Sequence, residues 1–290
     1  MADGNASTSN DVTASLAYLA THAADACYRV FPPSSGRPAE APVFERFDMR
    51  IQDCRPLAAD LDLDRDGFVF CPHASAFRDV LDPAKVEAQY YPDMGDWLRA
   101  LVGAQAVVVF DHNVRSAVGA ARGQAGVRAP VDAVHDDYTE ASGPKRSAEL
   151  LDAHGLSHLK DRRVAMINVW RPLHGPVLDL PLTLCAAPSV APEDLVATPI
   201  HHYMEDRLDE PSHSGAIYSV RHNPAHRWYY VSAMQPDEVL VFKGYDSRTD
   251  VARYVPHTAF AHPACPAQFM PRESIEVRAV VVYPERAKTG

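Results

Sequence analysis

His135 and Asp137 are spaced so that both side chains could bind one metal ion. Residues i and i+2 of an extended strand point to the same side, which would bring the imidazole and the carboxylate together. His257, much farther along the chain, could supply a third ligand. Two histidines and one carboxylate leave adjacent positions open on Fe(II), where a 2-oxo acid and dioxygen can bind. The spacing therefore predicts a non-haem iron site.

A second pattern runs from Arg272 to Arg278, where polar and apolar residues alternate. Alternation with period 2 predicts a half-buried strand with both arginines on its polar face. A planar guanidinium matches a carboxylate well. We therefore expect Arg272, with the Ser274 hydroxyl, to hold the far carboxylate of 2-oxoglutarate. Arg278 is either a second contact for that carboxylate or the principal one, and the sequence leaves both assignments open.

Each pattern also has a simpler interpretation. A chain with fourteen histidines contains H-x-D tripeptides by chance, and arginines beside carboxylates usually form surface ion pairs that contribute roughly 0–1 kcal/mol. The metal site is favoured because the two patterns occur together and in this order: His257 lies shortly before the strand predicted from Arg272 to Arg278.

The chain resembles the AsaB/CmcJ-type hydroxylase/desaturase family of microbial secondary metabolism. The similarity extends from about residue 50 to the end, and its last three blocks are specific. The blocks are YYP (90–92), FDH (110–112), HDD (135–137), NVWRPL (168–173), KGYDS (243–247), PHTAF (256–260) and RESIEVR (272–278).

This resemblance implies a mainly β protein with flanking helices and a double-stranded β-helix core of the jelly-roll or cupin-like kind. It implies a non-haem Fe(II)/2-oxoglutarate-dependent oxygenase that uses dioxygen to hydroxylate or desaturate a small natural-product-like substrate. His135, Asp137 and His257 would be the iron ligands. The alternative that it leaves open is a non-catalytic accessory subunit of a methyltransferase-type partner enzyme.

His262 is a rival for the third ligand position. It stands ten residues before Arg272, a spacing similar to that of plant-type 2-oxoglutarate oxygenases. We prefer His257, because the family block places the ligand there and because the two prolines of residues 263–266 predict a loop after His262.

Four further residues are candidates for contacts with the substrate. If residues 164–170 form a core strand, Asn168 and Trp170 share one face, where the indole could form an apolar wall and the amide could hydrogen-bond the substrate or co-substrate. A packed tryptophan and a structural amide would give the same pattern. Arg171 could bind a substrate carboxylate, and Arg115 is a weaker candidate of the same kind.

Composition narrows the classes of partner. The chain has 290 residues, a net charge of −10 and a pI near 5.7, so nothing suggests binding to nucleic acid or to an anionic membrane. No apolar run approaches the roughly 20 residues that span a bilayer, and the N-terminus lacks the pattern of a signal peptide. Five cysteines without a C-x-x-C pair predict neither disulfides nor zinc. We expect a cytoplasmic enzyme with a small-molecule substrate, as a homodimer or with a partner enzyme.

The remaining sequence signals predict the domain bounds, helices and strands of the chain. Residues 1–14 are small and polar, which predicts a flexible N-terminus, and residues 15–290 are expected to form a single oxygenase domain. Helical signals lie mostly before residue 160: Asp82 and Pro83 begin one helix, and Gly103 and Gly155 each end one. Strands are expected at residues 106–110, 164–170, 228–233, 238–242 and 272–278.

Overall fold

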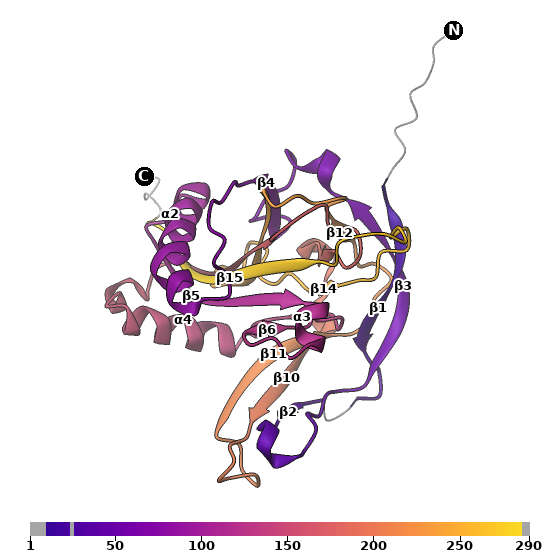
Figure 1. The fold of residues 1–290 in the computed structure, drawn as a ribbon. Helices are drawn as coiled ribbons and strands as arrows, with labels where there is room; N and C mark the ends of the chain where they lie inside the picture. Colours follow the sequence, from indigo (N-terminus) through magenta and orange to yellow (C-terminus); the bar gives the residue numbers. More distant parts are fainter. Residues whose placement is uncertain (1–9, 24–25, 286–290) are drawn as a thin grey trace.

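The computed structural model describes residues 10–23 and 26–285, and within them two β-sheets pack face to face (Figure 1). One sheet has nine strands, in the order β1 (Val12–Leu19), β3 (Phe44–Asp53), β12 (Trp228–Tyr230), β9 (Leu182–Cys185), β14 (His257–Ala259), β7 (His135–Asp136), β11 (His213–Val220), β10 (Leu195–His202) and β2 (Tyr28–Val30). The other has six, in the order β4 (Phe68–Pro72), β13 (Glu238–Asp246), β8 (Val164–Pro172), β15 (Glu273–Val282), β5 (Ala106–Ser116) and β6 (Val127–Arg128).

Helices flank the sheets, as expected, and the α-helices of the described part all end before residue 160. They are α1 (Pro83–Lys85), α2 (Tyr91–Val102), α3 (Ala117–Ala121) and α4 (Ser142–Ala153). Single turns of other helix types occur at η1 (Pro33–Ser35), η2 (Arg55–Leu57), η3 (Val86–Tyr90), η4 (Ser157–Leu159), η5 (Ala187–Ser189) and η6 (Pro192–Asp194). None of the helices described is long and apolar enough to cross a membrane.

The outer face of the six-stranded sheet is covered by α2. Met94 and Leu98 of this helix pack with Ile275 and Val277 of β15 in one buried cluster. The helix ends at Gly103, whose φ of 63° places it in the left-handed region that glycine adopts without strain. The apolar alternate positions of β15 therefore face α2, as the sequence pattern predicts.

The polar positions of β15 are buried too, which corrects the prediction of a half-buried strand. Arg272 is 2 % exposed, Ser274 1 % and Glu276 5 %. These side chains face the interior between the two sheets, where Leu240 and Phe242 of β13 pack against Leu182 and Leu184 of β9. Since buried charges need partners, a polar strand face inside a barrel indicates a site rather than a solvated edge.

Several element boundaries differ from the predicted ones. Val12, Thr13 and Ala14 pair with β3 and so belong to β1, not to a flexible N-terminus; residues 1–9 lie outside the described part. The helix before Gly155 begins at Ser142, where Thr139 Oγ1 accepts the Ser142 backbone N–H at 3.0 Å. Some of the predicted strands are longer than expected, since β5 continues to Ser116 and β13 to Asp246. The strand predicted at residues 228–233 ends at 230.

A chain of buried hydrogen bonds connects β1 with Trp228 of β12 in the nine-stranded sheet. The Tyr18 hydroxyl accepts from Trp228 Nε1 at 2.7 Å and lies 3.2 Å from His226 Nδ1. His226 Nε2 lies 3.0 Å from an oxygen of Asp194.

We expect Tyr18→Phe to lower the free energy of unfolding by about 1–3 kcal/mol, because the indole N–H of Trp228 is then buried without an acceptor. Urea unfolding of the variant and the wild type measures this difference. A loss below about 0.5 kcal/mol, the range of ordinary surface substitutions, would show that this chain of hydrogen bonds does not stabilise the sheet.

Candidate metal centre

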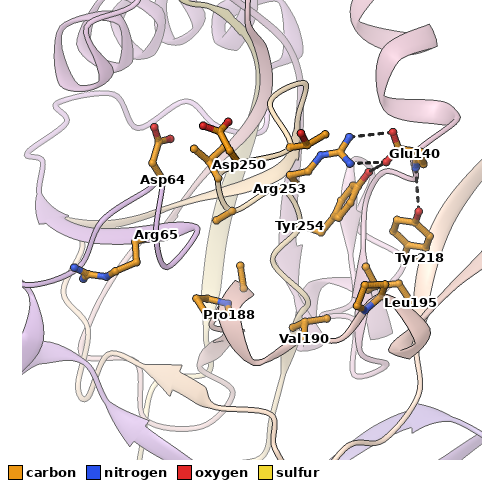
Figure 2. A pocket seen from close by; sticks show the side chains of 15 residues that line it. Asp64, Arg65, Glu140, Pro188, Val190, Leu195, Tyr218, Asp250, Arg253 and Tyr254 are labelled. Atoms are coloured by element: carbon orange, nitrogen blue, oxygen red, sulfur yellow. Dashed lines mark hydrogen bonds and ion pairs between the residues drawn. The ribbon is translucent and has the colours of Figure 1, made fainter.

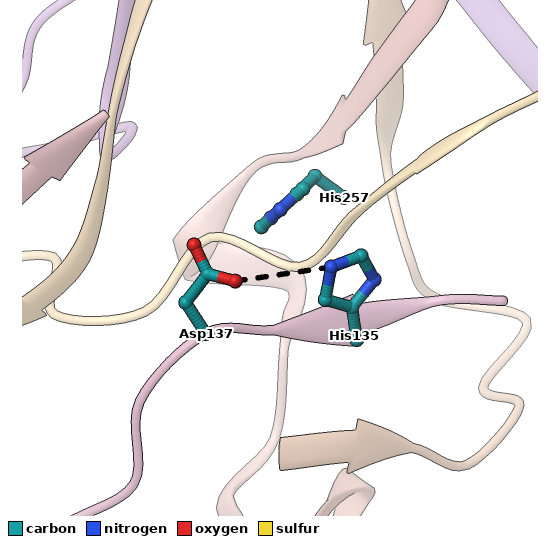
Figure 3. A group of neighbouring side chains, drawn as sticks. All are labelled: His135, Asp137 and His257. Carbon is teal, nitrogen blue, oxygen red and sulfur yellow. Dashed lines mark ion pairs between the residues drawn. The ribbon is translucent and has the colours of Figure 1, made fainter. Parts of the chain in front are cut away.

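Three side chains converge between the two sheets. His135 lies on β7, Asp137 follows directly after that strand, and His257 is the first residue of β14 (Figure 3). β7 and β14 are neighbours with His257 opposite His135, so both imidazoles project from the same face of the sheet. One ligand atom from each of the three residues lies within 4.8 Å of the others, and His135 Nε2 is 3.9 Å from Asp137 Oδ1. No other such group of three occurs among the described residues.

Backbone carbonyls orient both imidazoles. His135 Nδ1 lies 2.9 Å from the carbonyl oxygen of Ala133, and His257 Nδ1 lies 3.0 Å from that of Val255. Each ring thus donates its Nδ1–H and keeps the Nε2 lone pair for the centre, the arrangement that metal-ligating histidines adopt. Burial, with the adjacent His257, lowers the pKa of His135 to about 4, and burial also lowers the pKa of His257. Both rings are therefore neutral at pH 7, the form that binds a metal.

The Asp137 carboxylate is held by two residues of the six-stranded sheet. Asn168 Nδ2 donates to Asp137 Oδ2 at 2.7 Å, and Arg278 lies 3.0 Å from Oδ2 and 3.2 Å from Oδ1. Burial alone would raise the pKa of Asp137, but Arg278 and the two histidines hold it well below its usual range. The centre accordingly offers one anionic oxygen ligand and two neutral nitrogen ligands.

Asp136 is a site residue that the sequence did not reveal. Its carboxylate is fully buried and accepts the backbone N–H of Tyr138 at 3.1 Å and of Val255 at 2.8 Å. The second bond joins the strand that carries His135 to the segment that leads into His257. Only the fold brings these segments together, because Asp136 and Val255 lie far apart in the sequence.

A second link between the same segments borders a separate, larger pocket of about 670 Å³ (Figure 2). Glu140 accepts from Arg253 at 2.6 and 3.1 Å and from the Tyr254 hydroxyl at 2.9 Å. Tyr218 also lines this pocket, and its hydroxyl accepts the Glu140 backbone N–H at 3.1 Å. No residue of this pocket lines the cavity at the three converging side chains.

That central cavity is lined by arginines from two adjacent strands. Arg115 of β5, Arg272 directly before β15 and Arg278 of β15 share its wall with Glu276 and with the two histidines. Burial raises the pKa of Glu276, whereas burial and the neighbouring Arg115 lower the pKa of Arg272 to about 10. Three guanidinium groups face few carboxylates here, so the cavity suits an anion.

The arginines are not equivalent. Arg278 has its charge neutralised by Asp137, by Asp111 at 3.1 Å and by Glu276 at 3.3 Å. Arg272 instead lies over the ring of Trp170, 5.5 Å from its centroid, and its buried Nε has no hydrogen-bond partner among the described residues. The Ser274 hydroxyl, two residues along the same strand face, is likewise buried without a partner there. Arg278 Nε also lacks a hydrogen bond of good geometry among the described residues, but it lies 3.0 Å from the Asp137 carboxylate. Of the two candidates, Arg272 is thus the one whose guanidinium is not already paired with a carboxylate of the described part.

The structure separates the four predicted substrate residues. Trp170 and Arg115 line the central cavity, whereas Asn168 binds Asp137. Arg171 does not reach this cavity, because neighbouring strand residues point to opposite faces; its guanidinium donates to the Tyr90 hydroxyl at 2.8 Å on the outer side, beside a separate pocket.

His262 also lies apart from the centre. Its Nδ1 accepts the Ala264 backbone N–H at 3.2 Å, and its Nε2 lies 3.3 Å from the Tyr230 hydroxyl. Between the two rival histidines, the fold thus brings only His257 to the other two ligands.

Comparisons with known proteins agree with this geometry. Residues 16–282 match a family model described as an oxidoreductase/YMDC permease-like domain. The chain is 33 % identical over 239 residues to the Fe(II)/2-oxoglutarate-dependent dioxygenase nvfI of Aspergillus novofumigatus, which covers 80 % of this chain and 82 % of that protein. It is 31 % identical to the hydroxylase/desaturase efuI of Hormonema carpetanum, over 82 % of this chain and 84 % of that protein. The chain belongs to the Fe(II)/2-oxoglutarate-dependent hydroxylase/desaturase family.

A solved structure supports the same assignment. The iron and alpha-ketoglutarate-dependent endoperoxidase NvfI superimposes with a TM-score of 0.80 at 28 % identity, covering 95 % of this chain and 99 % of that one. The predicted family, the jelly-roll fold class and the dependence on Fe(II) and 2-oxoglutarate are thereby confirmed.

Proposed function

We propose that this protein oxidises a small-molecule substrate with Fe(II) bound by His135, Asp137 and His257. The observation that carries the proposal is the convergence of these three ligand atoms within 4.8 Å, with both histidines held in the ligating tautomer. When bound, Fe(II) and 2-oxoglutarate supply the activation of dioxygen for attack on a C–H bond. The protein holds the ligands, excludes water from the centre and places the substrate.

The arginine-lined cavity is proposed to hold 2-oxoglutarate, with Arg272 and Ser274 binding its far carboxylate. Two buried groups support this role, because Arg272 Nε and the Ser274 hydroxyl have no hydrogen-bond partner among the described residues. A buried donor without an acceptor lowers the stability of the folded protein unless a ligand supplies the acceptor. The cavity encloses about 20 Å³, close to the volume that one water molecule needs. Binding a five-carbon dianion therefore requires the long arginine side chains to swing aside. Arg115 lies at the same wall and could contact either the co-substrate or the substrate.

Anaerobic titration tests the metal assignment. Addition of Fe(II) and then 2-oxoglutarate to the protein is expected to produce a visible metal-to-ligand charge-transfer band, which a strong chelator removes. Absence of the band at saturating Fe(II) would contradict the proposal and favour the accessory-subunit alternative, in which a partner enzyme carries the chemistry.

Arg272→Lys tests the co-substrate contact. Lysine keeps the charge but loses the planar fork, so the affinity for 2-oxoglutarate should fall by about 1.5–3 kcal/mol, or roughly 10- to 150-fold. Iron binding should be unchanged, because Arg272 contacts none of the three ligands. Titration of the charge-transfer band with 2-oxoglutarate measures the first quantity, and titration with Fe(II) at saturating 2-oxoglutarate measures the second.

Arg278→Lys is the matched variant on the same strand face. Because Arg278 pairs with Asp137, this change should weaken iron binding more than it weakens the binding of 2-oxoglutarate to the iron-loaded enzyme. If Arg278→Lys lost the co-substrate and Arg272→Lys did not, the two roles would be exchanged.

A further inference from the structure

A groove separates α4 from the β10–β11 hairpin, which extends away from the sheets in Figure 1. It has a volume of about 250 Å³ and is distinct from both cavities described above. Ser142 at the start of α4 donates to the carbonyl of Ala216 on β11 at 2.9 Å, which closes one end of the groove. The groove is therefore built into the fold by the packing of a helix against a hairpin.

The floor of this groove reaches the metal centre. Asp137 and Tyr138 line it, whereas His135 and His257 line the arginine-rich cavity. The three converging side chains thus stand between two separate spaces. A molecule in the groove would approach the centre from the side of the Asp137 carboxylate, and a molecule in the cavity would approach it from the side of the histidines.

Basic side chains line the walls of the groove. Lys145 and Arg146 project from α4, and His202 and His213 face them from the hairpin, where their rings lie 6.0 Å apart. Burial lowers the pKa of His202, so the fixed charges of the walls above Asp137 are those of Lys145, Arg146 and Glu149. Glu149 pairs with Arg146 at 3.5 Å, which leaves Lys145 as the cation of these walls that is not paired among the described residues.

Lys145 stands out among the lysines that the structure describes. Lys85 pairs with Asp79, Lys160 with Asp152 and Lys243 with Asp64, each at 2.6 or 2.7 Å. Lys145 is an exposed ammonium at the groove, and no carboxylate among the described residues lies within ion-pair distance of it. It is thus the lysine whose charge is available to a ligand.

Apolar surface lies beside these cations. Ile200, Ala216 and Ile217 are half buried along the hairpin side, and the Tyr138 ring is 8 % exposed at the floor. Ligand sites commonly combine such apolar walls with a few polar groups that set the orientation of the ligand.

We propose that this groove binds the substrate, and that the substrate joins an apolar body to an acidic group that pairs with Lys145. The apolar body lies along Ile200 and Ile217, and the acidic group lies toward the mouth, away from Asp137. This arrangement keeps like charges apart and directs the apolar body toward the metal centre. The inference rests on the proposed function, because it takes Asp137 as an iron ligand.

A matched pair of fluorescent probes tests the inference without iron or turnover. 8-Anilinonaphthalene-1-sulfonate and N-phenyl-1-naphthylamine share their ring system, and only the first carries an acidic group. In the wild type, the sulfonate should bind more tightly than the neutral amine. Lys145→Met should weaken sulfonate binding by up to about fivefold, since an exposed ion pair contributes at most about 1 kcal/mol, and should leave the amine unaffected.

Two further variants locate the site. A Cβ added at Gly215 meets no atom within 4 Å, so Gly215→Trp can fill the groove without strain and should weaken both probes. Lys160→Met removes a lysine that pairs with Asp152 outside the groove and should change neither.

The outcomes separate this inference from the proposed function. Sulfonate binding that is absent, or that neither Lys145→Met nor Gly215→Trp weakens, would overturn the groove as the substrate site. Equal losses of both probes in Lys145→Met would overturn the acidic group. None of these results contradicts the proposed function, because none of them depends on Fe(II) binding. Absence of the charge-transfer band would contradict the proposed function, whichever result the probes give.

Discussion

Asp137→Ala is expected to abolish the charge-transfer band that Fe(II) and 2-oxoglutarate produce in the wild type. The substitution removes the only anionic ligand of the proposed centre and leaves two neutral imidazoles, which hold Fe(II) far more weakly. It also removes the carboxylate that Arg278 and Asn168 contact, so the guanidinium of Arg278 adds uncompensated positive charge beside the metal position. The two effects act in the same direction. Anaerobic absorption spectra at increasing Fe(II) measure the loss.

Asp111→Ala provides the matched control. Asp111 also pairs with Arg278, at 3.1 Å, but it lies on β5 and is not one of the three converging ligands. This variant should keep the band. An unchanged band in Asp137→Ala would mean that Asp137 is not a ligand, and an equal loss in both variants would mean that it acts only through Arg278.

His257→Ala should eliminate Fe(II)-dependent succinate formation from 2-oxoglutarate. His257 is 3 % exposed, and no other histidine of the described part is placed to replace it beside His135 and Asp137. Removal of one nitrogen ligand leaves the iron with two protein ligands. Succinate production at saturating Fe(II) and 2-oxoglutarate, with and without a candidate substrate, gives the measurement.

His262→Ala is the comparison that makes this result specific. The His262 ring contacts Tyr230 and Phe260 rather than the centre, so this variant should retain most of the succinate formation. The reverse result, with activity lost in His262→Ala and kept in His257→Ala, would move the third ligand and would require a different register for β14.

Residue spacing was sufficient to predict the chemistry of the centre, because strand geometry is local. His135 and Asp137 meet because residues two apart share a face, and the alternation from Arg272 to Arg278 sets which side chains of β15 point inward. The same rule explains why Arg171 lies apart from the central cavity: it is adjacent to Trp170 and therefore points to the opposite face, toward Tyr90. Capping residues were equally local signals. Asp82 accepts the Lys85 backbone N–H, and Gly103 ends α2.

Contacts between distant segments could not be predicted in this way. The bond from Asp136 to the Val255 backbone N–H, the neutralisation of Arg278 by Asp137 and Asp111, and the groove above Asp137 all depend on how the two sheets and α4 pack. β15 was expected to be half buried, and packing buried its polar face as well. The sequence by itself thus determined the side chains for which we propose binding of Fe(II) and of an anion, because side-chain chemistry and strand periodicity are properties of neighbouring residues. Only the tertiary structure decided which histidine joins the centre, which of the two arginines of the strand pairs with a carboxylate and from which side a substrate can approach, because those outcomes depend on long-range packing.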